Sequence, residues 1–372
     1  MRTAISSISI SGFRQFDGLE LKHLGRVNLV TGRNNTGKSS LLEAFLLLSD
    51  GASIISIRRL LNLREELGEP ILERPRLESL EVFSPIGSIF KGVPDITNKI
   101  PPITIKSGGA SPMHLEISVG YFSRTNDADG NSRLEPQEEI SASENELVVA
   151  LVCDSHLRKR IISTDRFRNP IRSNSLVPSD KGQMLCNFVG PTSSDRTTNL
   201  ADLWDNVALS DRERDLVEAL RIVAPDIDGV AMIGGEDGLR RNRTAIVRSK
   251  RFPKPVQLKL FGDGLSRVFG IVLSIINAKD GLLLIDEFEN GMHHTVQYEV
   301  WRVLFRLAKS LNVQVFATSH SWDAVEAFQK AAAEDPEEGV LIRLSRMGDA
   351  VIPTIFTEDE LAIATRDRIE VR

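Results

Sequence analysis

The sequence predicts an α/β protein whose core is a largely parallel β-sheet. In the two end segments, residues 1–50 and 201–372, short apolar runs alternate with helical patterns, as in a parallel sheet covered by helices. One run is followed by a glycine-rich turn, GRNNTGKS at 32–39, and then by an apolar helix. The middle segment, 51–200, lacks this alternation, and we expect it to form an insertion with a β and helical lobe.

Composition narrows the class of protein. The 372 residues are 41% hydrophobic and 26% charged, as in ordinary globular proteins. The formal net charge of -5 gives no overall attraction to nucleic acid, so any DNA contact must come from a local patch. Cys153 and Cys186 have no metal-ligand spacing. No signal peptide pattern opens the chain, and the longest apolar run, 268–276, is too short to cross a bilayer. We therefore expect a cytoplasmic protein with no membrane partner.

The first half of the chain contains both strand and helix patterns. Strands are expected at 7–13, 27–31, 113–123 and 146–153, and helices at 39–48 and 54–67. Between them, seven prolines punctuate 68–112, which predicts surface insertion or irregular structure.

A polar tip at 126–131 has two interpretations. It carries oxygen-bearing side chains near the spacing of a calcium loop, namely Asp127, Asp129, Asn131 and Glu138. However, Gly130 falls one place too early for such a loop, and alternating strand patterns flank the tip. These features favour a hairpin turn.

The second half is richer in helices. Helices are expected at 200–204, 211–222, 264–278, 296–311 and 321–333, buried strands at 281–285 and 313–317, and hairpins over 232–260. Ser210 followed by Glu213 predicts a capping box for the second of these helices. Two short strands and a polar tail are expected after the last helix.

The segment 32–39 fits the pattern Gly, four residues, Gly-Lys-Ser. In such a loop the backbone wraps a phosphate, and the N-terminus of the following helix adds a positive dipole. Lys38 would reach the β and γ phosphates, and Ser39 would hold Mg²⁺. The position between a buried strand and an apolar helix favours a nucleotide site over a flexible glycine turn.

Two carboxylates follow the apolar strand at 282–285. The sequence LLLIDE places Asp286 at the end of the sheet, where it can bind Mg²⁺ through water. Glu287 can orient or deprotonate the attacking water. The alternative is a solvated strand end, which is common for a single acid but less so for a doublet beside a phosphate-binding loop.

Two further segments fit a nucleotide site. In FATSHS at 316–321, His320 can contact a γ-phosphate, although a lone histidine is also common as a satisfied surface or core residue. In FGDGLSR at 261–267, Gly262 and Gly264 open a helix and form a second anion site. Because one ATP needs one phosphate-binding loop, this second site suggests that another subunit completes the pocket.

The order of these motifs resembles an ABC-type ATPase head. The opening ISGFRQFDGLEL, the signature GDGLSR and the block LLLIDEFENGMHHTVQYEVW are similar to the RecF/SMC-related and OLD-like ATPases. The resemblance covers residues 1–50 and about 200–372, whereas 51–200 match poorly. It implies ATP and Mg²⁺ as cofactors and a fold with an antiparallel β subdomain beside the core sheet.

The resemblance also assigns roles to single residues. Walker A would comprise Gly32, Asn35, Thr36, Gly37, Lys38, Ser39 and Ser40. Asp286 would be the Walker B acid, Glu287 the catalytic glutamate and His320 the switch histidine. The signature, acting across a dimer, would be Gly262, Asp263, Gly264 and Leu265. The D-loop at the dimer seam would hold Asn290, Gly291 and His293, and Phe13 and Arg14 would lie near the adenine. The Q-loop glutamine stays open between Gln137 and Gln183.

Two departures from the family pattern limit what the resemblance implies. The signature GDGLS replaces the Ser-Gly-Gly-Gln core of transporter-like heads. Only residues 321–372 follow His320, too few for the TOPRIM nuclease domain of OLD proteins. The Asp pairs at 127/129 and 226/228 precede Walker B in turn-like contexts, so we expect no nuclease activity in this chain.

Two basic runs bear on partners. The run 239–260 has eight Lys or Arg and no acid: Arg240, Arg241, Arg243, Arg248, Lys250, Arg251, Lys254 and Lys259. The run 157–172 has six basic residues against one Asp. Either run can track the phosphates of duplex DNA or form a solvated hairpin face. Few aromatic residues accompany them, which disfavours stacking on single-stranded bases.

Three functions follow. The first is an ATP-gated oligomeric switch, at least a dimer, that acts in anti-phage defence through a separately encoded effector such as a nuclease or toxin. The second is a RecF-like repair ATPase that binds duplex DNA. The third is a transporter ATPase subunit, which the signature and the opening segment disfavour.

Overall fold

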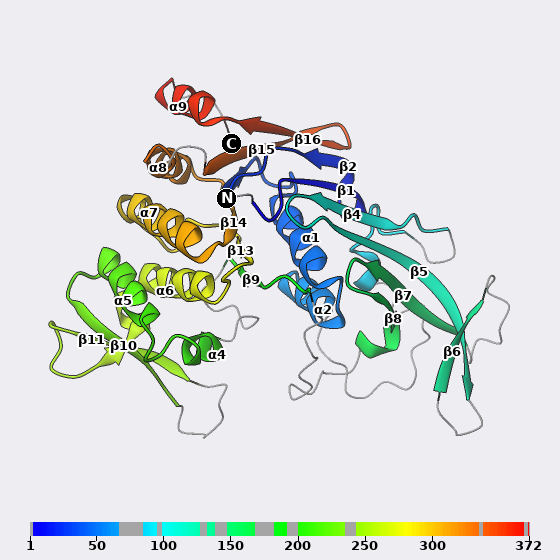
Figure 1. Cartoon of the computed structure of the whole chain (residues 1–372), viewed down its shortest axis with the longest axis horizontal. Coiled ribbons are helices and arrows are strands. Elements are labelled where there is room, and N and C mark those ends of the chain that lie inside the picture. Colours follow the sequence, from blue (N-terminus) through cyan, green and yellow to red (C-terminus); the bar gives the residue numbers. More distant parts are fainter. Residues whose placement is uncertain are drawn as a thin grey trace.

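The computed structural model describes residues 3–66, 85–94, 99–126, 132–137, 147–167, 182–191, 200–234, 243–334, 338–367 and 371. Within these residues the chain forms two large sheets, a small three-stranded sheet and the helices that cover them (Figure 1). No helix in this described part is long and apolar enough to cross a membrane.

The larger helices cover a six-stranded, mostly parallel sheet. Its order is β16-β15-β3-β14-β13-β9. The strands are β3 (Val27–Thr31), β9 (Cys186–Val189), β13 (Leu282–Ile285), β14 (Gln314–Thr318), β15 (Gly339–Met347) and β16 (Ala350–Phe356). All neighbouring pairs are parallel except β15 and β16. In register, Ile285 lies opposite Ala317 on one side and Val189 on the other, so the strand ends meet at one edge.

A second sheet of seven strands is antiparallel. Its order is β2-β1-β4-β5-β7-β8, with β6 paired to β5. The strands are β1 (Ser7–Phe13), β2 (Phe16–Leu21), β4 (Ile103–Gly108), β5 (Met113–Asn126), β6 (Ser132–Gln137), β7 (Leu147–Ser155) and β8 (Lys159–Ser163), followed by the turn η1 (Thr164–Phe167). This sheet is the antiparallel subdomain that the resemblance implies.

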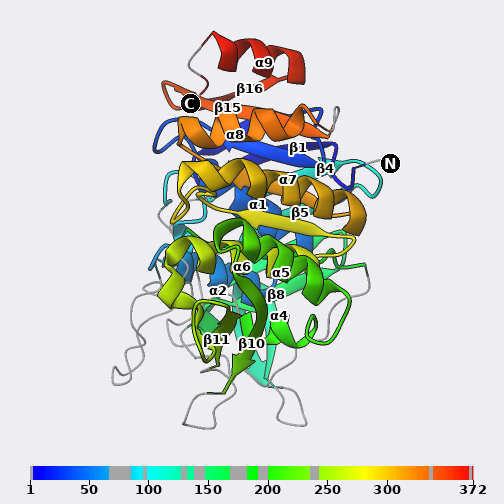
Figure 2. The same ribbon diagram turned by 90° about the vertical axis from the view of Figure 1, so that its left-hand side faces the viewer.

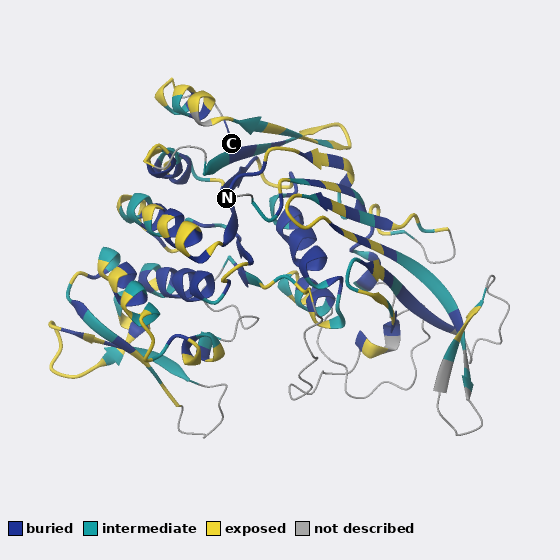
Figure 3. Cartoon of the chain, in the orientation of Figure 1, coloured by how far each residue is buried: buried dark blue, intermediate teal, exposed yellow. Residues whose placement is uncertain are grey.

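Helix α1 (Lys38–Asp50) lies between the two sheets. It contacts strands of both sheets, and every residue from Ser40 to Ser49 is buried (Figure 3). The sequence SSLLEAFLLLS explains this placement, since a helix that is apolar on all sides must be covered on all sides. Phe45 stacks on Phe316 of β14 with ring centroids 4.0 Å apart. Helix α2 (Ile54–Leu63) follows and packs against α1.

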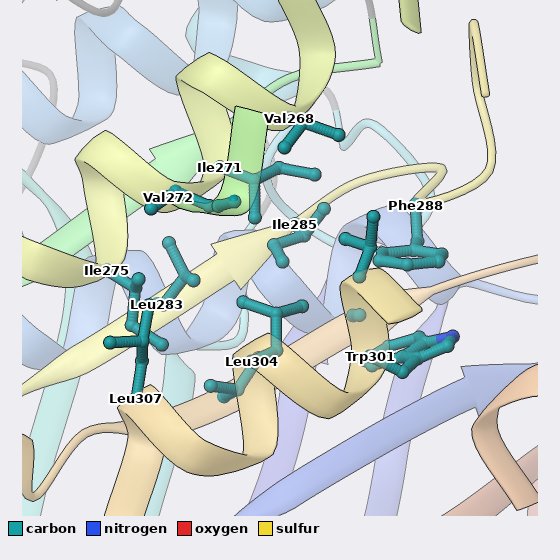
Figure 4. Packing of buried hydrophobic residues seen from close by; sticks show 14 of the residues in the cluster. Val268, Ile271, Val272, Ile275, Leu283, Ile285, Phe288, Trp301, Leu304 and Leu307 are labelled. Carbon is teal, nitrogen blue, oxygen red and sulfur yellow. The ribbon is translucent and has the colours of Figure 1, made fainter. Parts of the chain in front are cut away.

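The opposite face of the parallel sheet carries a stack of helices. The stack comprises α5 (Arg212–Val223), α6 (Asp263–Ile276), α7 (His294–Leu311), α8 (Trp322–Ala332) and α9 (Glu358–Arg366), and it is visible in both views (Figure 2). Strand β13 alternates between the two cores, because Leu283 and Ile285 face this stack whereas Leu282 and Leu284 face α1. Figure 4 shows Leu283 and Ile285 between α6 and α7.

A small unit caps the far end of the stack. It consists of α4 (Leu200–Asp205), α5 and a sheet of β10 (Ile227–Ile233), β11 (Thr244–Ser249) and β12 (Val256–Gln257). The turn η3 (Leu258–Phe261) then leads from this sheet into α6.

The sequence predicted most of these elements to within a few residues, but it missed several strands and one helix. The proline-rich segment contains β4, which lies between β1 and β5; Pro101 and Pro102 precede the strand and do not interrupt it. Strand β2 was not predicted. Strand β9 lies in the segment that was expected to be an insertion, but it pairs with β13 of the parallel sheet. The polar tail contains α9, with a capping box between Thr357 and Glu360.

The predicted capping box at Ser210 also does not form. Asp211 is the N-cap residue of α5, and the Glu213 carboxylate accepts a hydrogen bond from the N–H of Leu209 instead. The Ser210 hydroxyl accepts from the N–H of Arg212. The turn tip at 127–131 lies outside the described residues, but β5 and β6 pair antiparallel on either side of it, as expected for a hairpin.

Candidate nucleotide-binding and hydrolysis site

The predicted phosphate-binding loop connects the buried β3 to α1. Gly32, Asn35 and Gly37 all have positive φ, at 142°, 63° and 98°. A side chain on Gly32 would place its Cβ 2.4 Å from the carbonyl oxygen of Leu344. The first backbone N–H groups of α1 have no partner within the helix, as at any helix N-terminus. The loop therefore ends at a row of unpaired donors, which is the arrangement that phosphate-binding loops use.

Gly37 is the most tightly enclosed position of this loop. A Cβ there would lie 2.7 and 2.8 Å from two ring carbons of Phe16 and 2.2 Å from Gln15 Nε2. Gln15 lies in the turn between β1 and β2, and Phe16 is the first residue of β2, so the antiparallel sheet fixes the loop from the side.

We expect Gly37→Ala to lower the free energy of unfolding by about 1–3 kcal/mol because of its strained φ, and further because of the overlap with Phe16. Gly348→Ala is the matched control, since Gly348 also has a positive φ, 61°, but has open space around it. Urea unfolding of both variants measures the difference. An equal loss in the two variants would show that the contact with Phe16 contributes nothing.

Lys38 folds back onto its own loop. Its Nζ donates hydrogen bonds to the carbonyl oxygens of Gly32, at 2.6 Å, and Arg33, at 3.1 Å. Burial lowers the pKa of Lys38 from its ordinary value, and the nearby carboxylates of Asp286, Glu289 and Glu287 oppose that shift. The ammonium group is thus held by two carbonyl oxygens of its own loop, and three acids that follow β13 favour its charged form.

The loop and the Walker B strand meet at Asp286. Its Oδ1 accepts hydrogen bonds from Ser39 Oγ, at 3.1 Å, and from Thr318 Oγ1, at 2.6 Å. Asp286 is 7% exposed. A carboxylate beside a hydroxyl provides the hard oxygen ligands that Mg²⁺ prefers, directly or through water. Ser39 and Asp286 therefore fit the metal role that the sequence predicts for them.

Glu287 is held beside Asp286 by two contacts. Its backbone N–H donates to Thr318 Oγ1 at 2.8 Å, and its carboxylate accepts a hydrogen bond from Asn290 Nδ2. Its φ is 50°, a left-handed conformation that costs energy in a residue with a side chain. Thr318 thus links both acids, and the sequence reasoning did not single it out. The available sequence signal was its place in FATSHS, the segment that was singled out for His320.

Arg267 is a second residue that the sequence reasoning missed. It lies on α6 and is 2% exposed. Its guanidinium donates to the carbonyl oxygens of Asp286, at 2.5 Å, and Glu287, at 2.9 Å, and also to that of Gly190. A lone arginine within the apolar run of α6 was the sequence signal. The Arg267 side chain therefore connects α6, the helix that begins at the predicted signature, to the backbone of Asp286 and Glu287.

The predicted signature and D-loop pack together within the chain. A Cβ on Gly264 would lie 2.8 Å from the carbonyl oxygen of Gly291, and one on Gly291 would lie 3.2 Å from Asp263 Cβ. Gly262 and Asp263 are exposed, and Gly262 has open space around it. His293 is exposed and caps α7, accepting a hydrogen bond from the N–H of Thr295.

His320 lies at the end of β14 but faces a different acid from the catalytic candidate. Its Nδ1 is 3.2 Å from Glu289 Oε1, and its backbone N–H donates to the same oxygen at 3.0 Å. The histidine side chain is 51% exposed.

Arg14 is held by acids of the chain itself. Its side chain is 7% exposed and forms ion pairs with Glu43, at 3.2 Å, and Glu66, at 2.6 Å. Glu43 lies on α1, so Arg14 ties that helix to the antiparallel sheet. Phe13 is fully buried. The placement of both residues near the adenine stays a prediction of the resemblance.

The two Q-loop candidates lie on segments other than the phosphate-binding loop. Gln137 donates to Ser123 Oγ in the hairpin of β5 and β6, and Gln183 is exposed ahead of β9. Gln15, which the sequence analysis did not consider, lies against the phosphate-binding loop at Gly37.

Acids from other segments neutralise part of the basic run 239–260. Arg243 pairs with Asp205 at 2.5 Å, Arg248 with Asp228 at 2.6 Å, and Arg251 with Asp226 at 3.1 Å. Arg240 and Arg241 lie outside the described residues. Three of the basic side chains in the described part of this run therefore have acidic partners within the chain.

Two segments of the chain match known families. Residues 7–71 match a family described as "AAA domain", and residues 180–325 match one described as "AAA domain, putative AbiEii toxin, Type IV TA system". The first segment contains the loop with Lys38 and Ser39, and the second contains Asp286, Glu287 and His320.

Solved structures decide the fold. The SMC head bound to the C-winged-helix domain of ScpA superposes with a TM-score of 0.50 at 11% identity, covering 95% of this chain and 97% of that one. An Smc head domain with an extended coiled coil, bound to the C-terminal domain of ScpA from Pyrococcus furiosus, gives 0.50 at 10% identity over all of both chains. This chain has the fold of an SMC head. The ABC-type head that the motifs predicted is thereby confirmed as a fold.

Relatives found by sequence are similar to this chain at low to moderate identity. A protein named "ATP/GTP phosphatase" from Helicobacter pylori is 22% identical over 394 residues, spanning 96% of both chains. An uncharacterized protein of Methanocaldococcus jannaschii is 34% identical over 95 residues, which cover 25% of this chain and 82% of that protein.

Proposed function

We propose that this SMC-head chain binds ATP with Mg²⁺ on the loop 32–39 and hydrolyses it to ADP and phosphate. Lys38 contacts the phosphates, Ser39 and Asp286 hold the metal, and Glu287 orients the attacking water. The observation that carries the proposal is the shared position of Asp286, whose Oδ1 is hydrogen-bonded to Ser39 of the loop and to Thr318 beside Glu287. Metal, phosphate and water sites would then lie within one pocket.

The comparisons support this chemistry. The named activity of the Helicobacter pylori relative is nucleotide hydrolysis, and both halves of the candidate site fall in segments that match AAA domains. The remaining Walker A residues, Gly32, Asn35, Thr36, Gly37 and Ser40, shape the loop. We propose His320 as the group that senses the γ-phosphate.

We further propose that ATP binding closes a dimer. The exposed Gly262 and Asp263 begin α6, and Gly264 brings that helix against Gly291 of the D-loop. An exposed helix N-terminus of this kind suits the phosphate of a nucleotide held by a second copy. Arg267 connects the same helix to the backbone of Asp286 and Glu287, so closure can be transmitted to the acids.

The oligomeric state tests this switch. Light scattering on the Glu287→Gln protein should show a dimer or larger assembly with ATP and a smaller species with ADP. Asp263→Lys, which would place a cation beside the partner's Mg²⁺ and Lys38, should prevent the assembly. A mass that ignores both ATP and these changes would refute the switch, although it would leave hydrolysis itself untouched.

For the biological role we propose anti-phage defence with a separately encoded effector. The resemblance to OLD-like ATPases and the AbiEii-related family description support it. Phage plaque counts on cells carrying this gene with its neighbours, and with Lys38→Ala as the blank, test this role. Equal plaque counts would argue against it.

The alternative is a RecF-like ATPase that binds duplex DNA. Three of the six basic residues that are candidates for DNA contact form ion pairs with acids of the chain. Among the candidates that the structure describes, Lys250 is exposed and no ion pair is shown for it. ATP hydrolysis with and without duplex DNA at low salt distinguishes the two functions. Salt-sensitive stimulation, lost on neutralising Arg240, Arg241 and Arg243, would favour the DNA function.

A further inference from the structure

A third carboxylate lies in the candidate site, and none of the roles above includes it. Glu289 follows β13 in the turn that contains Glu287 and Asn290. One of its oxygens, Oε1, accepts a hydrogen bond from the backbone N–H of His320 at 3.0 Å and lies 3.2 Å from Nδ1 of the same residue. Two contacts from one oxygen fix both the backbone and the ring of the histidine.

The second oxygen of Glu289 is buried and has no hydrogen-bond partner among the described residues. The side chain is 9% exposed. A buried carboxylate oxygen without a donor is rare in folded proteins and calls for a reason. Glu289 also opposes the burial-induced lowering of the Lys38 pKa, more strongly than Glu287 does. The carboxylate of Glu289 thus favours the charged form of Lys38.

This contact favours one tautomer of His320. A carboxylate oxygen accepts hydrogen bonds, so its position 3.2 Å from Nδ1 favours the ring form with the proton on that nitrogen. Nε2 is then the nitrogen left for another partner, and the ring cannot rotate without losing the contact. Acids that hold a functional histidine in this way orient it and select its tautomer.

We propose that Glu289 is a positioning residue for ATP hydrolysis, which orients His320 so that Nε2 is available to the γ-phosphate. The inference rests on the proposed function, since it assigns a role within that site. Glu289 itself touches no reacting atom in this scheme. Its removal should therefore act through His320 and should change turnover more than ATP binding.

The experiment measures kcat and KM for ATP in Glu289→Ala, Glu289→Gln, His320→Ala and the double variant Glu289→Ala/His320→Ala. We expect Glu289→Ala to lower kcat by about tenfold, the lower end of the effect of removing such orienting groups, with KM unchanged. Glu289→Gln should stay close to wild type, because the amide oxygen can accept the same hydrogen bond from the backbone N–H of His320 and can face Nδ1 of the ring. The double variant should be no slower than His320→Ala alone, because both changes remove one function.

Glu326→Ala is the matched control, since Glu326 forms an exposed ion pair with Lys330 on the neighbouring α8, and it should leave kcat unchanged. Thermal unfolding of every variant separates a loss of turnover from a loss of folded protein. A wild-type kcat in Glu289→Ala, additive losses in the double variant, or a Glu289→Gln rate as low as that of Glu289→Ala would each overturn the inference. A wild-type rate no higher than that of Lys38→Ala would instead overturn the proposed function, and the inference with it.

Discussion

Glu287→Gln should lower the rate of ATP hydrolysis by about 10²–10⁴-fold, the usual contribution of a general acid or base. The carboxylate lies beside the metal candidate Asp286 and is held by Asn290 Nδ2, so it is placed to accept a proton from water. The amide of glutamine has nearly the same shape but cannot accept that proton. ATP binding should be unchanged, because neither Lys38 nor Ser39 loses a contact.

Single-turnover hydrolysis and the binding of a fluorescent ATP analogue separate these two effects. Glu299→Gln serves as the control, since Glu299 is half-exposed on α7 and pairs with Arg302. A Glu287→Gln protein that hydrolyses ATP at the wild-type rate would assign the proton transfer to another group. Weakened analogue binding would show that the glutamate shapes the pocket instead.

Arg267→Met should lower kcat by about 10–100-fold, as expected for a buried group that holds the ligands of a metal in place. The methionine fills a similar volume but leaves three carbonyl oxygens, those of Gly190, Asp286 and Glu287, without the donors they have now. Asp286 and Glu287 would lose the contact that fixes their backbone against α6. The same change should weaken the ATP-dependent dimer, because α6 carries the signature.

Arg302→Met is the matched control, since Arg302 is an exposed arginine on α7 whose partners are the side chains of Glu299 and Glu334. Urea unfolding, read together with kcat at a temperature where each variant is folded, keeps stability and turnover apart. If Arg267→Met lost stability but kept the wild-type kcat, Arg267 would be a structural residue alone.

The parts of the site that lie close together in sequence were predictable. The spacing of Gly32, Gly37 and Lys38 requires positive φ and a helix start, and both are present. The strand and acids of LLLIDE were equally clear, because four buried aliphatic residues before two carboxylates can hardly form anything but a strand end.

The parts that depend on packing between distant segments were not predictable. Thr318 reaches Asp286 because β14 pairs with β13 in parallel, and no local pattern gives that register. The acids that hold Arg14, Glu43 and Glu66, lie 29 and 52 residues away, so no local pattern predicts these ion pairs.

The partners of the basic run also come from distant segments. The run 239–260 contains no acid, yet Asp205, Asp226 and Asp228 reach it from α4 and from the start of β10. Strand β4 was missed because prolines dominated the segment around it, although the six residues of the strand itself contain none. In both cases the structure depends on other segments: acids from elsewhere in the chain pair with the basic run, and β1 and β5 pair with β4.

The most direct test of the central claim is the steady-state hydrolysis of ATP by the wild-type protein and by Lys38→Ala, with Mg²⁺ and with a chelator. If the loop at 32–39 and the acids after β13 form one site, the wild type hydrolyses ATP only with Mg²⁺, and Lys38→Ala shows background rates in both conditions. Hydrolysis that persists in the chelator, or that survives in Lys38→Ala, would contradict it.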